Sequence, residues 1–433
     1  MKTRIAHVLL LLTLTLTGCN DQSGTATDSS SQDDTDQPLR TPAELTADEL
    51  AIVSASNDFA VDFFRGVCGQ TPSEENVFVS PLSASYALTM TANGCAGPTR
   101  DSMLHALALE GMTIDEINEG YHQLARILTQ ADPAVNFSIA NSFWSRQGKA
   151  IQPEYIDMAN TFYDARVEEV DITQPWVADT INQWVEDKTA GKIKDMVASP
   201  LDFAAMLLNA IYFKADWRYP FDTADTRERD FRLSDGTNKV WETMHLAAED
   251  VVVDTSFPPV YNPDITVFAN QDLSMISLPY GDEGFEMLVI VPDSSTTVDD
   301  FVADMTLADL TSWIDQLHVE RFWLSLPKIR FSFESMLNDV LIGMGMGIAF
   351  TPGMADFGNM FVDGVGWIDQ VKQKAFVQVD EHGTEAAAVT QVIVADSLPP
   401  VIDATRPFVF MIREAQSGTI LFMAKIAEPM WEE

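Results

Sequence analysis

The sequence predicts an α+β fold, formed by one large domain that follows a short N-terminal leader. Apolar residues between Leu50 and Phe64 recur at helical spacing, which indicates a first amphipathic helix. The short runs 204–213 and 285–291 are almost wholly apolar, which is typical of buried strands. No internal repeat and no linker interrupts the chain after residue 46, so these helices and strands belong to one mixed domain.

The predicted elements follow in order along this domain. The first helix begins near Thr46 and leads into a loop over residues 69–72. Pro81 belongs in the first turn of a second helix that continues through residues 82–93, because proline is tolerated there and Ser80 can cap the N-terminus. Another helix spans residues 179–188 and ends before Gly191. Strands are predicted over residues 137–144, 204–213, 285–291, 322–326 and 328–333, with a hairpin joining 407–413 to 419–426.

The first 45 residues form a targeting segment and a tether. Lys2 and Arg4 precede an apolar stretch over residues 8–16 that is too short to span a bilayer. Residues 16–19, Leu-Thr-Gly-Cys, resemble the bacterial lipoprotein signal, which implies removal of residues 1–18 and acylation of Cys19. The alternative is an ordinary secretory signal with a chance cysteine. Residues 19–45 are rich in small polar side chains and are expected to form a flexible tether to a folded domain at 46–433. The expected location is the cell envelope, periplasmic or at the cell surface, with a lipid anchor.

Charge and cysteine content limit the partners and the cross-links. The formal net charge of −39 argues against nucleic acids and other polyanions as partners. If Cys19 carries lipid, Cys68 and Cys95 remain, and in an oxidising envelope they could form a disulfide contributing about 3–4 kcal/mol. Two buried free thiols are the alternative. After the leader no apolar run reaches about 18 residues, so no transmembrane helix is expected in the mature chain.

Short motifs between about residues 48 and 430 together resemble the serpin family. In chain order they are residues 76–83, 181–185, 189–193, 208–214 with Trp217, 278–280, 326–328, 356–357 and 406–408. Each motif is weak alone, but their order and spacing are specific. The resemblance implies the serpin fold, with three β-sheets, about eight to nine helices and an exposed reactive-centre loop. In this chain the loop runs from about Glu381 to Pro400.

Residues 379–390 resemble the hinge of inhibitory serpins. The family implies that a protease cleaves a bond farther along the loop and is held as an acyl-enzyme while the loop inserts into a sheet. Alternate residues of a strand share one face. The row that would be buried is small or β-branched and carries no charge and no proline: Thr384, Ala386, Ala388, Thr390, Val392 and Val394. The hinge residues are Glu381, Gly383, Thr384, Glu385, Ala386, Ala387, Ala388 and Thr390.

The hinge pattern predicts an inhibitor, a suicide substrate of a serine or cysteine endopeptidase. Counting forward from Gly383 with the common family spacing places Ser397 before the scissile bond and Leu398 after it, which suits elastase- or subtilisin-like enzymes. Counting back from the motif at 406–408 places Asp396 before the bond, which resembles the bait of poxvirus serpins that block Asp-specific proteases and is slightly favoured. No Lys or Arg lies in the loop, so trypsin-like targets are not expected. The alternative is a non-inhibitory serpin-fold protein that serves as a binding or scaffold protein of the envelope.

One departure from the family pattern concerns the shutter, the region where the sheet opens. Many members have a histidine facing Asn209, whereas this chain has Gln373. We therefore expect an amide pair between Gln373 and Asn209, with Ser80 and Ser83 nearby.

Catalytic signatures are not found in the sequence. The histidines are scattered without an HExxH pair, there is no GxSxG elbow, and Asp-Phe-Gly at 356–358 lacks the other kinase motifs. The sequence therefore predicts a protein that is not an enzyme, needs no cofactor or metal, and acts as a monomer.

Overall fold

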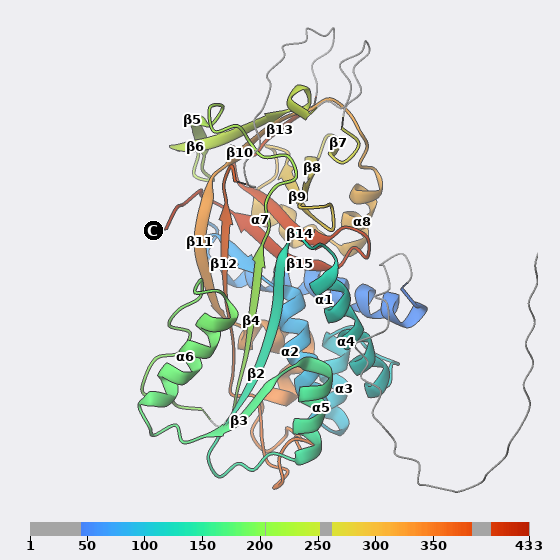
Figure 1. Ribbon diagram of the computed structural model, residues 1–433, viewed down its shortest axis with the longest axis vertical. Coiled ribbons are helices and arrows are strands. Elements are labelled where there is room, and N and C mark those ends of the chain that lie inside the picture. Colours follow the sequence, from blue (N-terminus) through green and yellow to red (C-terminus); the bar gives the residue numbers. More distant parts are fainter. Residues whose placement is uncertain (1–44, 204, 252–261, 383–399, 433) are drawn as a thin grey trace, which may run out of the picture. The chain divides into compact units, whose positions relative to one another are not determined.

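The computed structural model describes residues 45–203, 205–251, 262–382 and 400–432, which form an α+β fold with three sheets (Figure 1). The described part contains nine α-helices. In chain order they are α1 (Ala47–Gln70), α2 (Pro81–Asn93), α3 (Gly97–Ala106), α4 (Ile114–Gln130), α5 (Pro153–Tyr163), α6 (Trp176–Lys188), α7 (Val298–Asp304), α8 (Leu307–Asp315) and α9 (Asn338–Leu341).

The sheet that matters most for function has five strands, and we call it sheet A. Its order is β11 (Ile329–Met336), β12 (Gln370–Val379), β4 (Ala205–Lys214), β2 (Asn136–Arg146) and β3 (Arg166–Val170). β12 and β4 are parallel neighbours, whereas β11 pairs antiparallel with β12 and β2 pairs antiparallel with β4.

The other two sheets have six and four strands. Sheet B has the order β1 (Val77–Val79), β15 (Ile420–Ile426), β14 (Phe408–Glu414), β9 (Phe285–Pro292), β8 (Leu273–Tyr280) and β7 (Thr266–Ala269). Sheet C has the order β13 (Val401–Asp403), β10 (Trp323–Pro327), β6 (Asn238–Ala247) and β5 (Arg227–Arg232). β13 and β5 are therefore the two edge strands of sheet C.

Sheet A is buried on both faces by two separate apolar clusters. Inward side chains of β12, such as Ala375 and Val377, join the main core that sheet B and α1 also line. On the other face, Ile181 and Trp184 of α6 pack against Leu208 of β4. Alternation along each strand thus directs one row towards sheet B and the other towards α6.

The sequence-based elements and the fold class are confirmed, with ends shifted by a few residues. Pro81 starts α2, and the Ser80 side chain accepts a hydrogen bond from the Ser83 amide, as expected of a cap. The first helix is longer than predicted and continues to Gln70. Leu50 was expected on its buried face but is 50% exposed, because the helix turns this position away from the core.

The two alternatives for the cysteines were a disulfide and a pair of buried free thiols. Cys68 and Cys95 are both buried and both are free thiols, so the disulfide is not formed. Each lies in its own packing environment: Cys95 Sγ is 3.5 Å from Met103 Sδ, whereas Cys68 belongs to α1. Burial raises the pKa of Cys68 to about 12 and also raises the pKa of Cys95 well above the ordinary thiol value.

Both thiols should resist alkylation in the folded protein, because the reactive species is the thiolate and both groups are buried as thiols. Iodoacetamide at neutral pH should modify neither Cys68 nor Cys95 before unfolding, and both after unfolding, as read by peptide mass spectrometry. A mass increase on reduction of the untreated protein would instead reveal a disulfide.

Candidate functional site

The candidate site is a gap between the two central strands of sheet A. β12 and β4 pair only at one end, where residues 370–372 oppose residues 206–208. Beyond this, residues 373–379 and 209–214 show no pairing across the gap among the described residues. The outer edges of both strands are occupied, by β11 and by β2. Each strand therefore turns a row of unpaired backbone groups towards the gap, which is the arrangement that accepts another strand.

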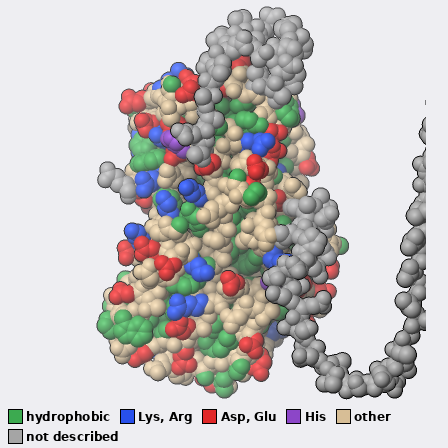
Figure 2. All heavy atoms as spheres, in the orientation of Figure 1, with side chains coloured by type: hydrophobic (Ala, Val, Ile, Leu, Met, Phe, Trp, Pro, Cys, Tyr) green, Lys and Arg blue, Asp and Glu red, His purple; other side chains and the backbone are tan. Residues whose placement is uncertain are grey.

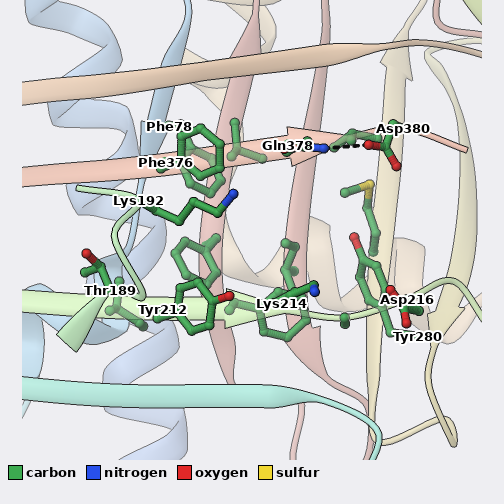
Figure 3. Close-up of a pocket in the computed structure, with 18 of the residues that line it drawn as sticks. Phe78, Thr189, Lys192, Tyr212, Lys214, Asp216, Tyr280, Phe376, Gln378 and Asp380 are labelled. Atoms are coloured by element: carbon green, nitrogen blue, oxygen red, sulfur yellow. Dashed lines mark hydrogen bonds between the residues drawn. The ribbon is translucent and has the colours of Figure 1, made fainter. Parts of the chain in front are cut away.

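The gap opens into a cavity of about 480 Å³. Its floor is apolar and comes from strands of sheet B: Phe78, Met287, Ile412 and Phe422. Figure 3 shows Lys192, from the connection after α6, extending over the gap beside Phe376 of β12, and Lys192 Nζ lies 5.3 Å from the centre of that ring. The cavity thus offers an apolar bed between two hydrogen-bonding edges.

The connection between α6 and β4 crosses the outer side of β12 and is tied to it. Lys372 Nζ donates to the Met196 carbonyl at 2.9 Å, and Lys374 Nζ donates to the Lys194 carbonyl at 2.7 Å. Any strand that entered the gap fully would have to displace this connection.

At the open end of the gap the chain is anchored just beyond β12. Glu381, only 5% exposed, accepts a hydrogen bond from Thr226 Oγ1 at 2.7 Å and forms an ion pair with Lys328 Nζ at 3.1 Å. Trp217 Nε1 donates to the Asp380 carbonyl at 2.8 Å, and its ring stacks on Tyr280. These contacts fix the point from which the loop departs.

The anchor perturbs both charged groups. Burial opposes ionisation of Glu381, but hydrogen bonds from Thr226, from its own backbone and from Lys328 outweigh it, so the pKa of Glu381 is lowered. Burial likewise opposes the charge on Lys328, but the hydrogen bonds and charges of Glu381 and Glu242 prevail and the pKa of Lys328 is raised.

Sequence reasoning found only part of this anchor. It placed Glu381 in the hinge and Trp217 in a motif, but it gave no role to Lys328 or Thr226. The residues 326–328 motif was the available signal, because a lysine between two strands is well placed to meet a carboxylate at their ends.

The predicted amide pair between Gln373 and Asn209 is not formed. Gln373 instead binds the backbone of Ser80 at both groups: Nε2 donates to the carbonyl at 2.8 Å and Oε1 accepts from the amide at 2.9 Å. Asn209 Nδ2 donates to Asn141 Oδ1 at 2.6 Å, directly across the β2–β4 pair. The longer glutamine side chain reaches down to the start of α2, whereas asparagine reaches only its neighbour on the adjacent strand.

Ser80 and Ser83 lie at this position as expected, but in structural roles. Ser80 Oγ donates to the Leu421 carbonyl at 2.7 Å and caps α2, and Ser83 is fully buried in the first turn. Gln373 therefore fastens β12 to the helix start rather than to β4.

Gln373→Leu should destabilise the native state by about 1–3 kcal/mol, because the buried Ser80 amide loses its partner while the Ser80 carbonyl keeps the Ala84 amide. The denaturation midpoint should fall accordingly. Gln378→Leu is the matched control, since Gln378 lies on the same strand but is exposed. Equal midpoints for the two variants would contradict a stabilising role for the contact between Gln373 and Ser80.

Many predicted site residues lie outside the described residues: Cys19, Gly383, Thr384, Glu385, Ala386, Ala387, Ala388, Thr390, Asp396, Ser397 and Leu398. The described chain stops at His382 and resumes at Pro400, just before β13.

The described residues show neither a metal-binding cluster nor a membrane-spanning helix. They contain no group of three or more His, Cys, Asp or Glu side chains placed to hold a metal ion. None of the described helices is long and apolar enough to cross a membrane.

Comparisons with known proteins place this geometry in context. The family model described as serpin (serine protease inhibitor) matches residues 54–429. A serpin-like protein of Thermococcus kodakarensis is 33% identical, covering 88% of this chain and 86% of the relative. The leukocyte elastase inhibitor of Sus scrofa is 30% identical, covering 87% of this chain and 99% of the relative.

Solved structures give the same picture. The native state of tengpin, a thermophilic serpin, matches with a TM-score of 0.77 and 25% identity over 89% of this chain and 95% of that one. Human thyroxine-binding globulin, solved in complex with thyroxine, matches with a TM-score of 0.76 and 25% identity over 89% of this chain and 100% of that one.

Proposed function

The chain belongs to the serpin family, and from this we propose that it inhibits an endopeptidase as a suicide substrate. After cleavage, the loop that follows Glu381 would insert between β12 and β4 and carry the acyl-enzyme with it. The observation that carries this proposal is the parted pair of strands, which offers a free backbone edge on each side of an apolar cavity.

Chain direction supports insertion at this gap. β12 and β4 run parallel, and the chain leaves β12 at the open end of the gap. A strand formed by the following residues would return antiparallel to both neighbours, and antiparallel pairs are readily joined by a short turn.

A simple register accounts for the composition of the hinge. With residues 380–383 as the turn, Thr384 would lie opposite Val379, and Ala386, Ala388 and Thr390 would follow opposite Val377, Ala375 and Gln373. Directly opposed residues share a face, and these four β12 side chains are all buried. The small, uncharged row of the loop would thus face the cavity floor.

The same register would place Thr390 at the shutter. Lys372 pairs with Leu208, so Gln373 and Asn209 stand at the same level on either side of the gap. Asn209 Oδ1 is buried and has no hydrogen-bond partner among the described residues. The Thr390 hydroxyl would be available to donate to it, which favours insertion at least this far.

The energy available from insertion is large. A dozen new backbone hydrogen bonds, each contributing about 1 kcal/mol net, amount to roughly 10 kcal/mol. Whole domains are stable by only about 5–15 kcal/mol. The uncut state would therefore persist because conversion is slow, as in other kinetically trapped proteins.

The decisive experiment incubates the folded domain with elastase-like, subtilisin-like and Asp-specific proteases, with trypsin for comparison. We expect an SDS-resistant complex with at least one of the first three. Mass spectrometry of the released peptide would distinguish cleavage at Asp396–Ser397 from cleavage at Ser397–Leu398. Clean cleavage by every protease, with no complex, would exclude inhibition by trapping.

A second candidate is a non-inhibitory serpin that binds a ligand or serves as a scaffold in the envelope. The structural likeness to thyroxine-binding globulin, a binding protein by its name, keeps this candidate in view. The same protease panel separates the two, because a binding protein would be cleaved without trapping the enzyme.

We also propose that residues 1–18 are removed, that Cys19 carries the lipid, and that residues 19–45 tether a monomeric inhibitor domain, residues 46–433, to the cell envelope. Several acyl chains on one cysteine give stable anchoring. Cys19→Ser should move the protein from the detergent phase to the aqueous phase in detergent partitioning of expressing cells. An unchanged distribution would contradict the anchor.

A further inference from the structure

The chain continues beyond sheet B after β15 and is fastened on its way to sheet A. Asn76, just before β1, accepts hydrogen bonds at Oδ1 from the amides of Ala427 at 2.8 Å and Glu428 at 3.0 Å. Lys239 of β6 donates to the Pro429 carbonyl at 2.8 Å and forms an ion pair with Glu428. Residues 427–432, which we call the extension, are therefore held by sheets B and C before they reach sheet A.

The extension pairs with the outer edge of β11 (Figure 1). The Arg330 amide donates to the Met430 carbonyl at 2.8 Å, and the Glu432 amide donates to the Arg330 carbonyl at 2.8 Å. Arg330 and Trp431 are thus partners in a parallel bridge. The Ser332 amide donates to Glu432 Oε2 at 2.9 Å. The extension therefore covers the side of β11 that faces away from β12, at the open end of the gap.

The side chain of Trp431 lies over two cations at the start of β11. Bridge partners in parallel strands share a face, and so do residues two apart in one strand. Trp431 therefore lies on the same face as Arg330 and Lys328. Its ring centre is 5.3 Å from Lys328 Nζ and 5.8 Å from Arg330 Cζ, within the range of about 6 Å over which cation–π attraction acts. Figure 2 shows Lys and Arg side chains over β11 and β12 on this face.

Lys328 is the cation of the anchor at the open end of the gap. Its Nζ forms an ion pair with Glu381 at 3.1 Å, and its backbone carbonyl accepts from Trp241 Nε1 at 2.7 Å. A lysine side chain is long and has many rotamers, so one ion pair leaves its ammonium group considerable freedom. The indole of Trp431 reduces this freedom, because the negative face of an aromatic ring attracts the cation.

Arg330 holds the indole in place and takes no part in the anchor. It forms no ion pair among the described residues, and its buried Nε has no hydrogen-bond partner there. Its guanidinium lies between two rings, 5.8 Å from the centre of Trp431 and 6.0 Å from the centre of Phe376 on β12. Trp431 is 38% exposed, so its place is fixed by these cations and by the backbone bridge rather than by the core.

We propose that Trp431 is a positioning residue for the anchor: its indole holds the Lys328 ammonium against Glu381 and so fixes the open end of the gap. Trp431 touches no substrate and acts through Lys328. This role follows from the described contacts alone, and only its consequence for protease trapping rests on the proposed function.

Hydrogen exchange of the peptide covering residues 376–382 tests this directly. In Trp431→Leu the extension keeps an apolar side chain but loses the aromatic face, so Lys328 should leave Glu381 more often. A cation–π contact at an exposed site corresponds to roughly twofold to fivefold in an equilibrium, and local opening of this peptide should increase by that factor. Trp431→Phe keeps a ring face and should restore most of the protection.

Two further comparisons separate action through Lys328 from a general effect of the extension. In a background with Lys328→Met and Glu381→Gln, which leaves no unpaired charge, Trp431→Leu should no longer change the opening of residues 376–382. Trp176→Leu is the matched control, at a tryptophan of α6 that is 57% exposed, and should leave this peptide unchanged. The proposal is overturned if Trp431→Leu opens the peptide no more than the wild type or Trp431→Phe does, or if its effect persists in the background without the ion pair.

A protease assay gives the consequence for the inhibitor separately. During incubation below the unfolding transition, Trp431→Leu should lose its ability to form SDS-resistant complexes faster than the wild type, because a kinetically trapped state lasts only while its barrier holds. If the untreated protein forms no complex with any protease, the proposed function fails, while the exchange measurement still decides the role of Trp431. If complexes form and both proteins lose activity at the same rate, control of the lifetime of the inhibitor by Trp431 is excluded.

Discussion

Thr384→Arg should convert the protein from an inhibitor into a substrate. In the register above, Thr384 is the first inner residue to enter the gap, opposite the buried Val379. Overpacking there costs about 1–3 kcal/mol, and an unpaired buried charge costs more. Insertion would stall at its first step, and the acyl-enzyme would hydrolyse before it could be displaced.

The expected readout is the ratio of cleaved inhibitor to SDS-resistant complex. This ratio should rise by about tenfold or more, because a barrier higher by 1.4 kcal/mol slows a step tenfold. Glu385→Arg is the matched control, since residue 385 lies on the opposite row and would face away from the floor. Undiminished trapping by Thr384→Arg would rule out insertion in this register.

Glu381→Lys should produce the largest loss of native stability. It would place a second cation against Lys328, in a site where the Glu381 side chain is 6% exposed and the Lys328 side chain 19% exposed. Breaking a buried ion pair by removing one partner typically costs about 3–5 kcal/mol, and the partial exposure of Lys328 favours the lower end. The anchor at the open end of the gap would be lost, and the thermal midpoint should fall.

Two controls distinguish the stability lost with the ion pair from the stability lost when a larger side chain disrupts packing. Glu242 also contacts Lys328, at 3.5 Å, but its side chain is 64% exposed, so Glu242→Lys should cost only about 0–1 kcal/mol. The double variant Glu381→Lys with Lys328→Glu should recover part of the loss. Failure of the swap to recover any stability would mean that packing, rather than charge, fixes this end of β12.

The contribution of the Glu381–Lys328 ion pair to the free energy of unfolding is expected to depend on pH. The lowered pKa of Glu381 makes the contribution complete above the ordinary glutamate value of about 4.3 and lost as pH falls through the folded value. The raised pKa of Lys328 makes it complete below about 10.4 and lost as pH rises through the folded value. Lys328→Met should flatten the pH dependence of the thermal midpoint at both ends.

The sequence predicted the fold well because its signals are local or ordered along the chain. Pro81 after Ser80 identifies a helix start without knowledge of anything distant, and apolar runs such as 285–291 identify strands. The family motifs added the sheet arrangement. The exposure of Leu50 could not be predicted, because helical spacing gives a face but not its exact limits.

The side-chain partners of the site could not be predicted for a different reason. Whether Gln373 binds Asn209 or Ser80 depends on which strand or helix end packs against this part of β12. That packing is known only once the whole core is assembled. The same holds for Lys328 with Glu381, and for the separation of Cys68 from Cys95. Sequence patterns place residues on elements, whereas these pairs depend on distances between elements that are remote in the chain.

The contact between Gln373 and the Ser80 backbone does not depend on pH. An amide bound to the Ser80 backbone does not titrate, so the fastening of β12 to α2 has the same strength at every physiological pH. A histidine at this place would make the rate of strand opening depend on protons. In this chain, the proposed capture of a protease by strand opening would therefore keep the same speed across that pH range.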